Sequence, residues 1–172
     1  MMGQIGGLTL IALLASMISC SSVYDVDYHY DRLTPFPPLQ TYDWQTFTST
    51  DESTAELVKD AVNNRLSAKG FRMTTDNPDF LIMAHVAKQE KSRFERWDYQ
   101  YYNPPYWGQA SDYQYAEATL ILDIMSAQSE KLLWRGSATA DLDAVVNPEA
   151  KKELINTAVE KILAQFPPAK AP

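Results

Sequence analysis

Ala118-Thr-Leu-Ile-Leu-Asp-Ile-Met125 and Lys131-Leu-Leu-Trp-Arg-Gly-Ser-Ala-Thr-Ala140 are two strand-like runs joined by the short polar stretch Ser126-Ala-Gln-Ser129. Side chains alternate between the two faces of a strand, so every second residue of each run shares a face. The runs predict a β-hairpin with one apolar face. We expect that face to carry Leu120, Leu122, Ile124, Leu132 and Trp134 toward a common core.

Upstream of this hairpin, three further stretches have strand character. Residues 79–87 place Phe80, Ile82, Ala84 and Val86 on one face, and Leu81, Met83 and His85 on the other. We interpret His85 as a half-buried packing residue. Residues 39–47 are rich in aromatic and β-branched side chains, and residues 23–30 alternate in the same way. The sequence therefore predicts three to five strands, with residues 23–30 either a tether or an edge strand.

Two segments have the apolar periodicity of amphipathic helices. The first follows Ser53-Thr-Ala-Glu56, which has the spacing of a capping box, and it ends near Gly70, a residue suited to a left-handed C-cap. Its apolar face comprises Leu57, Val58, Ala61, Val62 and Leu66. The second follows Asn147-Pro148 and stops before Pro167-Pro168. Its apolar stripe comprises Leu154, Ile155, Ala158, Val159, Ile162, Leu163 and Phe166.

Strands and helices of this kind must bury their apolar faces together. The simplest arrangement is an α+β fold in which an antiparallel-rich β-sheet has two amphipathic helices packed on one face. Residues 39–168 are of a length suited to one such domain, and residues 169–172 form a C-terminal tail.

The N-terminus has the pattern of a lipoprotein signal peptide. The apolar run Leu8–Ile18 is about half the length that a membrane-spanning helix needs. It leads to Met17-Ile18-Ser19-Cys20, which resembles a bacterial lipobox, although Met17 replaces the usual Leu and residues 1–7 carry no Lys or Arg. Cys20 is the only cysteine, so it cannot form an internal disulfide. We expect residues 1–19 to be a signal peptide and Cys20 to be acylated and membrane-attached, the alternative being an ordinary signal peptide cleaved elsewhere.

Residues 20–38 then form the lipidated N-terminus and tether. Ser21 rather than Asp follows Cys20, which by analogy with enteric bacterial lipoproteins permits sorting to the outer membrane, with the domain facing the periplasm. The formal net charge of −7 disfavours binding to nucleic acid or to an anionic membrane surface. We interpret this charge as favouring solubility.

The segment between residues 94 and 115 contains nine aromatic side chains in 22 residues. Asn103-Pro-Pro105 rules out a continuous helix, so we expect a long connection between the strand that starts near Asp79 and the hairpin that starts near Ala118. Tyr and Trp supply large contact areas and concentrate at interfaces. The aromatic residues of this segment either fold back onto the sheet or form an exposed contact surface comprising Trp97, Tyr99, Tyr101, Tyr102, Tyr106 and Trp107.

The sequence contains little that indicates catalysis. The two histidines, His29 and His85, are far apart and have no ligand partners at helical spacing, so we expect no metal site and no cofactor. A Gly-x-Ser-x-Gly elbow is absent. Glycan hydrolysis would need two carboxylates at a defined separation. The acidic residues near the aromatic segment that could supply them are Asp98, Asp112, Glu117 and Asp123.

Several short motifs resemble those of the bacterial lipoproteins in domain-of-unknown-function family 4136. They are Tyr42-Asp-Trp44, Gly70-Phe71, Asn77-Pro-Asp-Phe-Leu-Ile82, Thr119-Leu-Ile-Leu-Asp-Ile124, Leu133-Trp-Arg-Gly-Ser-Ala138 and Phe166-Pro-Pro168. Ala118 departs from the Gly that members commonly place before the Thr-Leu strand. The resemblance implies a cell-envelope lipoprotein of α+β fold with no established activity.

Three functions are consistent with these features. The first is a lipid-anchored, noncatalytic binding or assembly module that uses the aromatic segment to contact an envelope protein or peptidoglycan. The second is an envelope hydrolase that acts on glycan through paired carboxylates. The third is a purely structural lipoprotein whose aromatic segment is buried.

Overall fold

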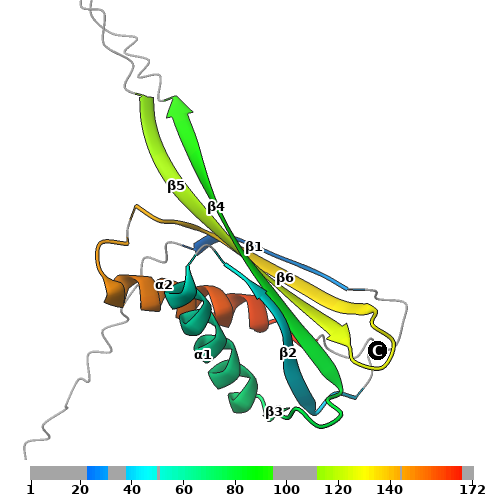
Figure 1. The fold of residues 1–172 in the computed structure, drawn as a ribbon. Helices are drawn as coiled ribbons and strands as arrows, with labels where there is room; N and C mark the ends of the chain where they lie inside the picture. The colour runs from blue at the N-terminus through cyan, green and yellow to red at the C-terminus, as the bar shows by residue number, and fades with distance from the viewer. Residues whose placement is uncertain (1–22, 31–37, 50, 95–111, 144, 168–172) are drawn as a thin grey trace, which may run out of the picture.

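The computed structural model describes residues 23–30, 38–49, 51–94, 112–143 and 145–167. These residues form two α-helices and one six-stranded mixed sheet that is mostly antiparallel (Figure 1). The prediction of an α+β fold with an antiparallel-rich sheet is therefore confirmed.

The sheet has the strand order β1-β6-β5-β4-β2-β3. Its strands are β1 (Val23–His29), β2 (Thr41–Thr48), β3 (Arg72–Met73), β4 (Phe80–Phe94), β5 (Asp112–Ser126) and β6 (Leu132–Asp141), and the helices are α1 (Glu52–Ala68) and α2 (Pro148–Leu163). Only β2 pairs in parallel, with β3 and with β4. The described residues contain one strand more than the largest number expected, because the two-residue β3 also joins the sheet.

β1 is an edge strand of this sheet. It pairs antiparallel with β6, from Val23 opposite Ala140 to His29 opposite Arg135. Pairing begins three residues after Cys20, so the first sheet residue lies at most about 10 Å along the chain from that cysteine.

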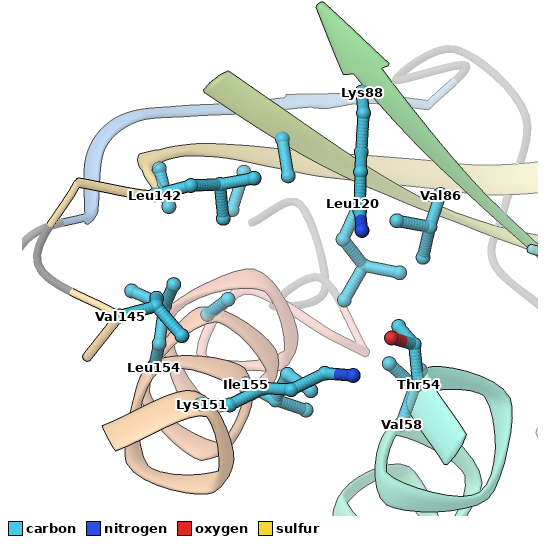
Figure 2. A pocket seen from close by; sticks show the side chains of 14 residues that line it. Thr54, Val58, Val86, Lys88, Leu120, Leu142, Val145, Lys151, Leu154 and Ile155 are labelled. Carbon is cyan, nitrogen blue, oxygen red and sulfur yellow. The ribbon is translucent and has the colours of Figure 1, made fainter. Parts of the chain in front are cut away.

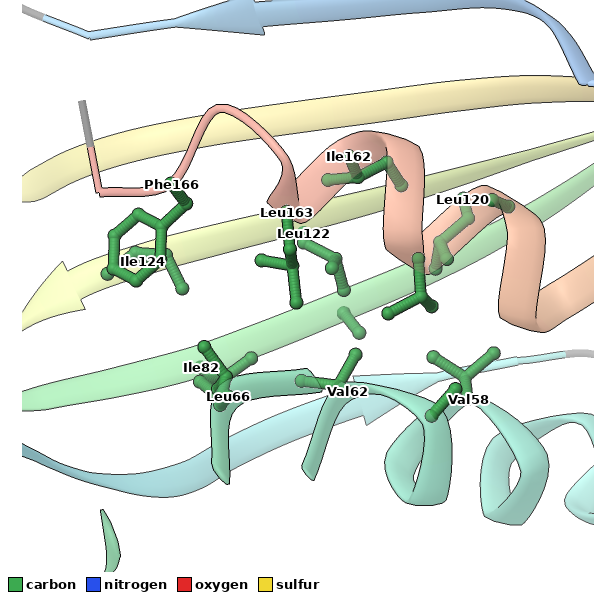
Figure 3. Close-up of a cluster of buried hydrophobic side chains, with 14 of the residues drawn as sticks. Val58, Val62, Leu66, Ile82, Leu120, Leu122, Ile124, Ile162, Leu163 and Phe166 are labelled. Carbon is green, nitrogen blue, oxygen red and sulfur yellow. The ribbon is translucent and has the colours of Figure 1, made fainter. Parts of the chain in front are cut away.

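A single buried cluster joins the sheet to both helices (Figure 3). The predicted inward residues Phe80, Ile82, Ala84 and Val86 of β4 are all buried, as are Leu120, Leu122 and Ile124 of β5. The two helices contact each other, and α2 also contacts β6 and β1. The helices contribute Val58, Ala61, Val62, Leu66, Ala158, Val159, Ile162 and Leu163 to the same cluster.

The prediction that Trp134 is buried in this core is confirmed, but the prediction that Leu132 is buried beside it is wrong. Trp134 is fully buried, but Leu132 is 42% exposed. Leu132 is the first residue of β6, and the pairing with β5 shifts by one residue between Ile124 and Met125. Because of this shift, Leu132 lies opposite Met125 and shares its face, which is the face opposite that of Ile124 and Trp134.

The N-cap of helix α1 lies two residues before the predicted one. Its N-cap is Asp51, not Ser53, and the Asp51 carboxylate accepts hydrogen bonds from the Thr54 backbone N–H (2.7 Å) and the Thr54 hydroxyl (2.7 Å). These hydrogen bonds, led by the Thr54 hydroxyl, hold the pKa of the Asp51 carboxyl well below its usual range. At the other end, Gly70 has a φ of 90°, which confirms the predicted left-handed residue after the helix.

Replacing Asp51 with alanine is expected to lower the free energy of unfolding by about 1 kcal/mol at pH 7, because the cap of α1 is lost. The lowered pKa means that the ionised cap stabilises the fold above about pH 4, and this contribution declines as the pH falls toward the folded pKa. The difference in the free energy of unfolding between Asp51→Ala and wild type, measured by urea unfolding, should therefore become smaller in acid. The matched control is Asp60→Ala, which removes an exposed aspartate from the middle of α1, and an equal loss in that variant would show that the effect is not specific to the cap.

The helix α2 begins as the sequence predicts. Asn147 is its N-cap and accepts a hydrogen bond from the Ala150 backbone N–H at 2.8 Å, with Pro148 in the first turn. Leu154 and Ile155 are only partly buried, although they belong to the predicted apolar stripe. Their incomplete burial reflects a pocket at this end of the core.

The central strands β4 and β5 are longer than expected. The sequence predicts strands that end near Ala87 and begin near Ala118, but β4 continues to Phe94 and β5 begins at Asp112. Each strand has 15 residues, and they pair without interruption from Phe80 opposite Ser126 to Phe94 opposite Asp112. Much of the expected connection is thus a two-stranded ribbon.

Candidate functional site

The paired ends of β4 and β5 extend beyond the rest of the sheet (Figure 1). The last pairing of β2 with β4 is at His85, and the last pairing of β6 with β5 is at Glu117. Among the described residues, residues 88–94 of β4 therefore pair only with β5, and residues 112–116 of β5 pair only with β4. We call these two segments the arm. At about 3.3 Å per residue, seven residues span roughly 23 Å.

An ion pair lies at the base of the arm. The Lys91 ammonium contacts the Glu117 carboxylate, which is the most buried charged group in the described chain at 6% exposure. The hydrogen bond to Glu117 raises the pKa of Lys91. This contact joins β4 to β5 where the arm leaves the sheet.

The arm connects to the aromatic segment. The predicted contact residues Trp97, Tyr99, Tyr101, Tyr102, Tyr106 and Trp107 lie outside the described residues, as does Cys20. The structure therefore describes the strands that flank the proposed contact surface, and the surface itself stays a prediction.

The carboxylates considered for glycan cleavage lie in separate environments. Asp123 accepts two hydrogen bonds from the Arg135 guanidinium, one of them 2.6 Å long. Glu117 is six residues away on the same strand, which corresponds to roughly 20 Å. This is much farther than the 5–9.5 Å typical of glycosidase pairs. Asp98 and the side chain of Asp112 lie outside the described residues.

The histidines do not lie where a shared site would need them. His85 lies on the face of β4 opposite the buried Ala84 and Val86, and it is exposed, so its interpretation as a half-buried packing residue is wrong. His29 is also exposed, on the edge strand. Within the described ranges, no three His, Cys, Asp or Glu side chains are grouped in a way that could hold a metal ion.

Several of the short sequence motifs have structural roles. Asp79 accepts hydrogen bonds from the backbone N–H groups of Gln40 and Thr41, both 2.9 Å, and these lower the pKa of its carboxyl. Asn63 of α1 accepts from the Tyr42 hydroxyl and from the Trp44 indole N–H, both 3.0 Å. These contacts connect β2 to β4 and to α1, so the motif residues position the elements.

The strongest candidate for a binding site is a pocket that sequence analysis did not identify (Figure 2). It has a volume of about 310 Å³ and lies between both helices, the inner face of the sheet, and Leu142 and Val145. This volume is at the lower end of the range of small-molecule sites. Its walls are almost entirely apolar, and they include Val58, Val86, Leu120, Leu142, Leu154 and Ile155.

Small side chains create the space in this pocket. Ala118, Ala138 and Ala140 line it from neighbouring strands, and Ala158 lines it from α2. At the opposite end of the core the sheet and helices are filled by Trp134 and Phe166 instead. The alternating alanines of β6 were the available signal in the sequence, but alanine alone does not distinguish a pocket from close packing.

Three charged groups lie at the rim of the pocket. Lys88 of β4 and Lys151 of α2 approach the Asp51 carboxylate at 3.8 Å and 3.2 Å, and Lys151 also contacts the Ser53 hydroxyl at 3.0 Å. Both lysines line the pocket. The contacts at the rim thus bring two ammonium groups to one carboxylate, while Glu56 and Asp60 line a neighbouring groove that Lys151 also lines.

Neither α1 nor α2 is long and apolar enough to cross a membrane.

Several solved structures are similar to this chain at low sequence identity, one of them with a TM-score above 0.5. A PDZ domain protein from Parabacteroides distasonis matches with a TM-score of 0.56 and 14% identity, covering 87% of this chain and 36% of the other. This chain thus spans about a third of that protein. The PelC dodecamer protein from Paraburkholderia phytofirmans matches with a TM-score of 0.49, 11% identity, and coverage of 81% and 94%. Lipoprotein GNA1162 from Neisseria meningitidis matches with a TM-score of 0.42, 12% identity, and coverage of 74% and 99%.

Comparison of the sequence with curated proteins finds no match. Comparison with protein families does, and the matched residues, 26–168, contain nearly all of the described structure, including the arm and the pocket. The chain therefore belongs to the family described as Domain of unknown function (DUF4136).

Proposed function

We propose that this protein is a lipid-anchored, noncatalytic binding module of the bacterial cell envelope, and that it contacts its partner through the arm and the aromatic segment. The observation that carries the proposal is the arm, in which β4 and β5 leave the sheet as an isolated pair. Family membership and the signal-peptide pattern before Cys20 support the location.

The arm is physically unusual for a free surface. A two-stranded hairpin is at best marginally stable in water, because it has few neighbours against which to bury its side chains. Its outer edges also present backbone N–H and C=O groups that can pair with another chain. A partner that covers the arm would supply both the burial and the hydrogen bonds. Such a partner could be an envelope protein or a peptidoglycan strand.

The proposed anchor holds the domain near the membrane. Acylation of Cys20 would place lipid three residues before β1, within about 10 Å of chain. Several acyl chains together give stable anchoring, whereas one gives only marginal binding. We place the anchor in the outer membrane with the domain facing the periplasm, on the basis of Ser21.

We also propose that both helices pack on one face of the sheet. The single buried cluster that combines residues of α1, α2 and the inner face of β4 and β5 supports this arrangement. The opposite face, which includes the half-buried Met83 and Ile121, would then be available to a partner that also covers the arm.

Site-specific photocrosslinking of the full chain in its own membrane tests the contact surface. A crosslinker at Gln89, which is exposed on the arm, is expected to capture a discrete partner. The matched control is Gln128, which is exposed in the turn between β5 and β6 at the other end of the sheet. Combining Tyr106→Ser with Trp107→Ser should reduce capture from Gln89 about tenfold or more, since a buried aromatic hot spot contributes about 2 kcal/mol.

Two results would contradict this surface. One is equal capture from Gln89 and Gln128, which would indicate collisions with neighbours in the membrane. The other is unchanged capture by the aromatic double variant when its circular dichroism shows that it is folded. Glycan rather than protein in the captured product would assign peptidoglycan as the partner.

A further inference from the structure

We propose that the pocket between the helices and the sheet binds a medium-chain fatty acid, with the alkyl chain inside and the carboxylate at Lys88 and Lys151. This site is separate from the arm, so the inference goes beyond the partner contact proposed above. It rests on the volume, lining and rim charges of the pocket.

The interior of the pocket matches an alkyl chain. The pocket-lining residues Val58, Val86 and Leu120 are buried. Leu154 and Ile155 also line the pocket and remain partly exposed, and no side chain of the described residues fills it. The one hydroxyl among the lining side chains, that of Thr54, already donates to Asp51. An alkyl chain makes no hydrogen bonds, so it would leave no polar group of this wall unsatisfied.

The rim matches an anionic head group. An ammonium has three donors. Lys151 directs donors to Asp51 and Ser53, and Lys88 approaches Asp51 only at 3.8 Å, beyond ordinary hydrogen-bond distance. The Asp51 carboxylate is shared further with Ser53 and Thr54. A second carboxylate placed between the two lysines would balance their charge and accept the remaining donors.

Figure 2 shows how these features are combined. The side chains of Lys88 and Lys151 extend along the pocket from opposite sides, one from the sheet and one from α2, with the apolar residues between and behind them. A ligand that is apolar along its length and negative at one end therefore fits better than a neutral lipid or a free anion.

Calorimetric titration with dodecanoate below its micelle concentration tests the site. The protein is the unlipidated chain from Ser21 to Pro172, which retains every described residue. We expect saturable binding that tightens about fourfold per added methylene from octanoate to dodecanoate, until the pocket is full. Dodecanol, which lacks the charge, should bind more weakly.

Two kinds of variant separate the alkyl and carboxylate contacts. Ala140→Leu fills the pocket from β6 and should abolish binding. Lys88→Gln combined with Lys151→Gln should weaken dodecanoate binding roughly tenfold while leaving dodecanol unchanged. The matched control is Lys152→Gln, which removes an exposed lysine of α2 that does not line the pocket. The lysine variants leave the packing intact, so they test the site even if Ala140→Leu unfolds.

Three outcomes would overturn the proposal. The first is no saturable binding to the wild-type chain. The second is equal affinity for dodecanoate and dodecanol with no effect of the lysine variants, which would mean nonspecific apolar adsorption. The third is binding by the unlipidated chain but not by the lipidated protein in nanodiscs, which would assign the pocket to the protein's own acyl chain. Photocrosslinking of the partner from Gln89 in the Ala140→Leu variant tests the arm independently of the pocket.

Discussion

Replacing Phe166 with alanine is expected to lower the free energy of unfolding by about 3–5 kcal/mol, the usual range for removal of a buried aromatic side chain. Phe166 lies beyond the last turn of α2 and is fully buried. Its ring is 5.3 Å from that of Trp134, 5.6 Å from that of Phe71 and 5.7 Å from that of Phe80. Alanine would leave a cavity between these rigid rings, which cannot collapse to fill it.

Urea unfolding followed by circular dichroism measures this loss. Gln165→Ala is the matched control, since it changes an exposed neighbour in the same stretch. Phe166→Leu retains most of the volume, so its loss should lie between those of the control and the alanine variant. A change below about 1 kcal/mol in Phe166→Ala would show that the end of the chain does not pack as described.

Replacing Trp134 with alanine should have an effect of similar size, about 3–5 kcal/mol. Trp134 is fully buried, and its indole N–H finds no acceptor among the described residues. Packing of the ring, rather than hydrogen bonding, is therefore its contribution. Trp134→Phe should be much less destabilising than Trp134→Ala, because it keeps an aromatic ring and removes the unpaired N–H group.

Gly136 provides an independent test of how Trp134 packs. A Cβ at position 136 would overlap Cη2 of Trp134 and lie 2.7 Å from Cγ2 of Ile162. Gly136→Ala should therefore destabilise the wild-type protein by about 1–3 kcal/mol. In a Trp134→Ala background the overlap with the ring disappears, so the same substitution should be less destabilising. Additive losses in this double-mutant cycle would contradict the close contact between the two residues.

These contacts explain the most specific of the family-like motifs. In Leu133-Trp-Arg-Gly-Ser-Ala138, the tryptophan fills the core and the glycine makes room for its ring. Arg135 faces the other side of the strand and pairs with Asp123 of β5. The residues of this motif therefore serve packing and strand pairing. Its presence in a sequence predicts the fold and carries no information on a reaction.

The sequence predicted much of the local structure, because local structure depends on near neighbours. Asn147-Pro148 begins α2, and Gly70 follows the end of α1 with a positive φ, as expected. The two exceptions have identifiable causes. Asp51 competes successfully with Ser53 for the cap of α1 because it also binds the Thr54 hydroxyl. Leu132 alternates with Trp134 in the sequence, but the register shift between β5 and β6 turns it to the other face of the sheet.

The candidate sites were less predictable. The aromatic residues drew attention to the segment after β4, but composition did not show that β4 and β5 would stay paired up to it. The pocket depends on alanines of two strands and α2 meeting where no large side chain reaches. No local pattern in the sequence predicts that these alanines meet in one place.

The sequence by itself determined the α+β class, the positions of the main strands and helices, and the face that each buries, since periodicity and caps act within a few residues. Only the tertiary structure decided that β4 and β5 form an arm, and that Lys88, Lys151 and Asp51 meet at the rim of an apolar pocket. These features join residues up to 100 positions apart. They depend on how complete elements pack against one another, which local sequence does not encode.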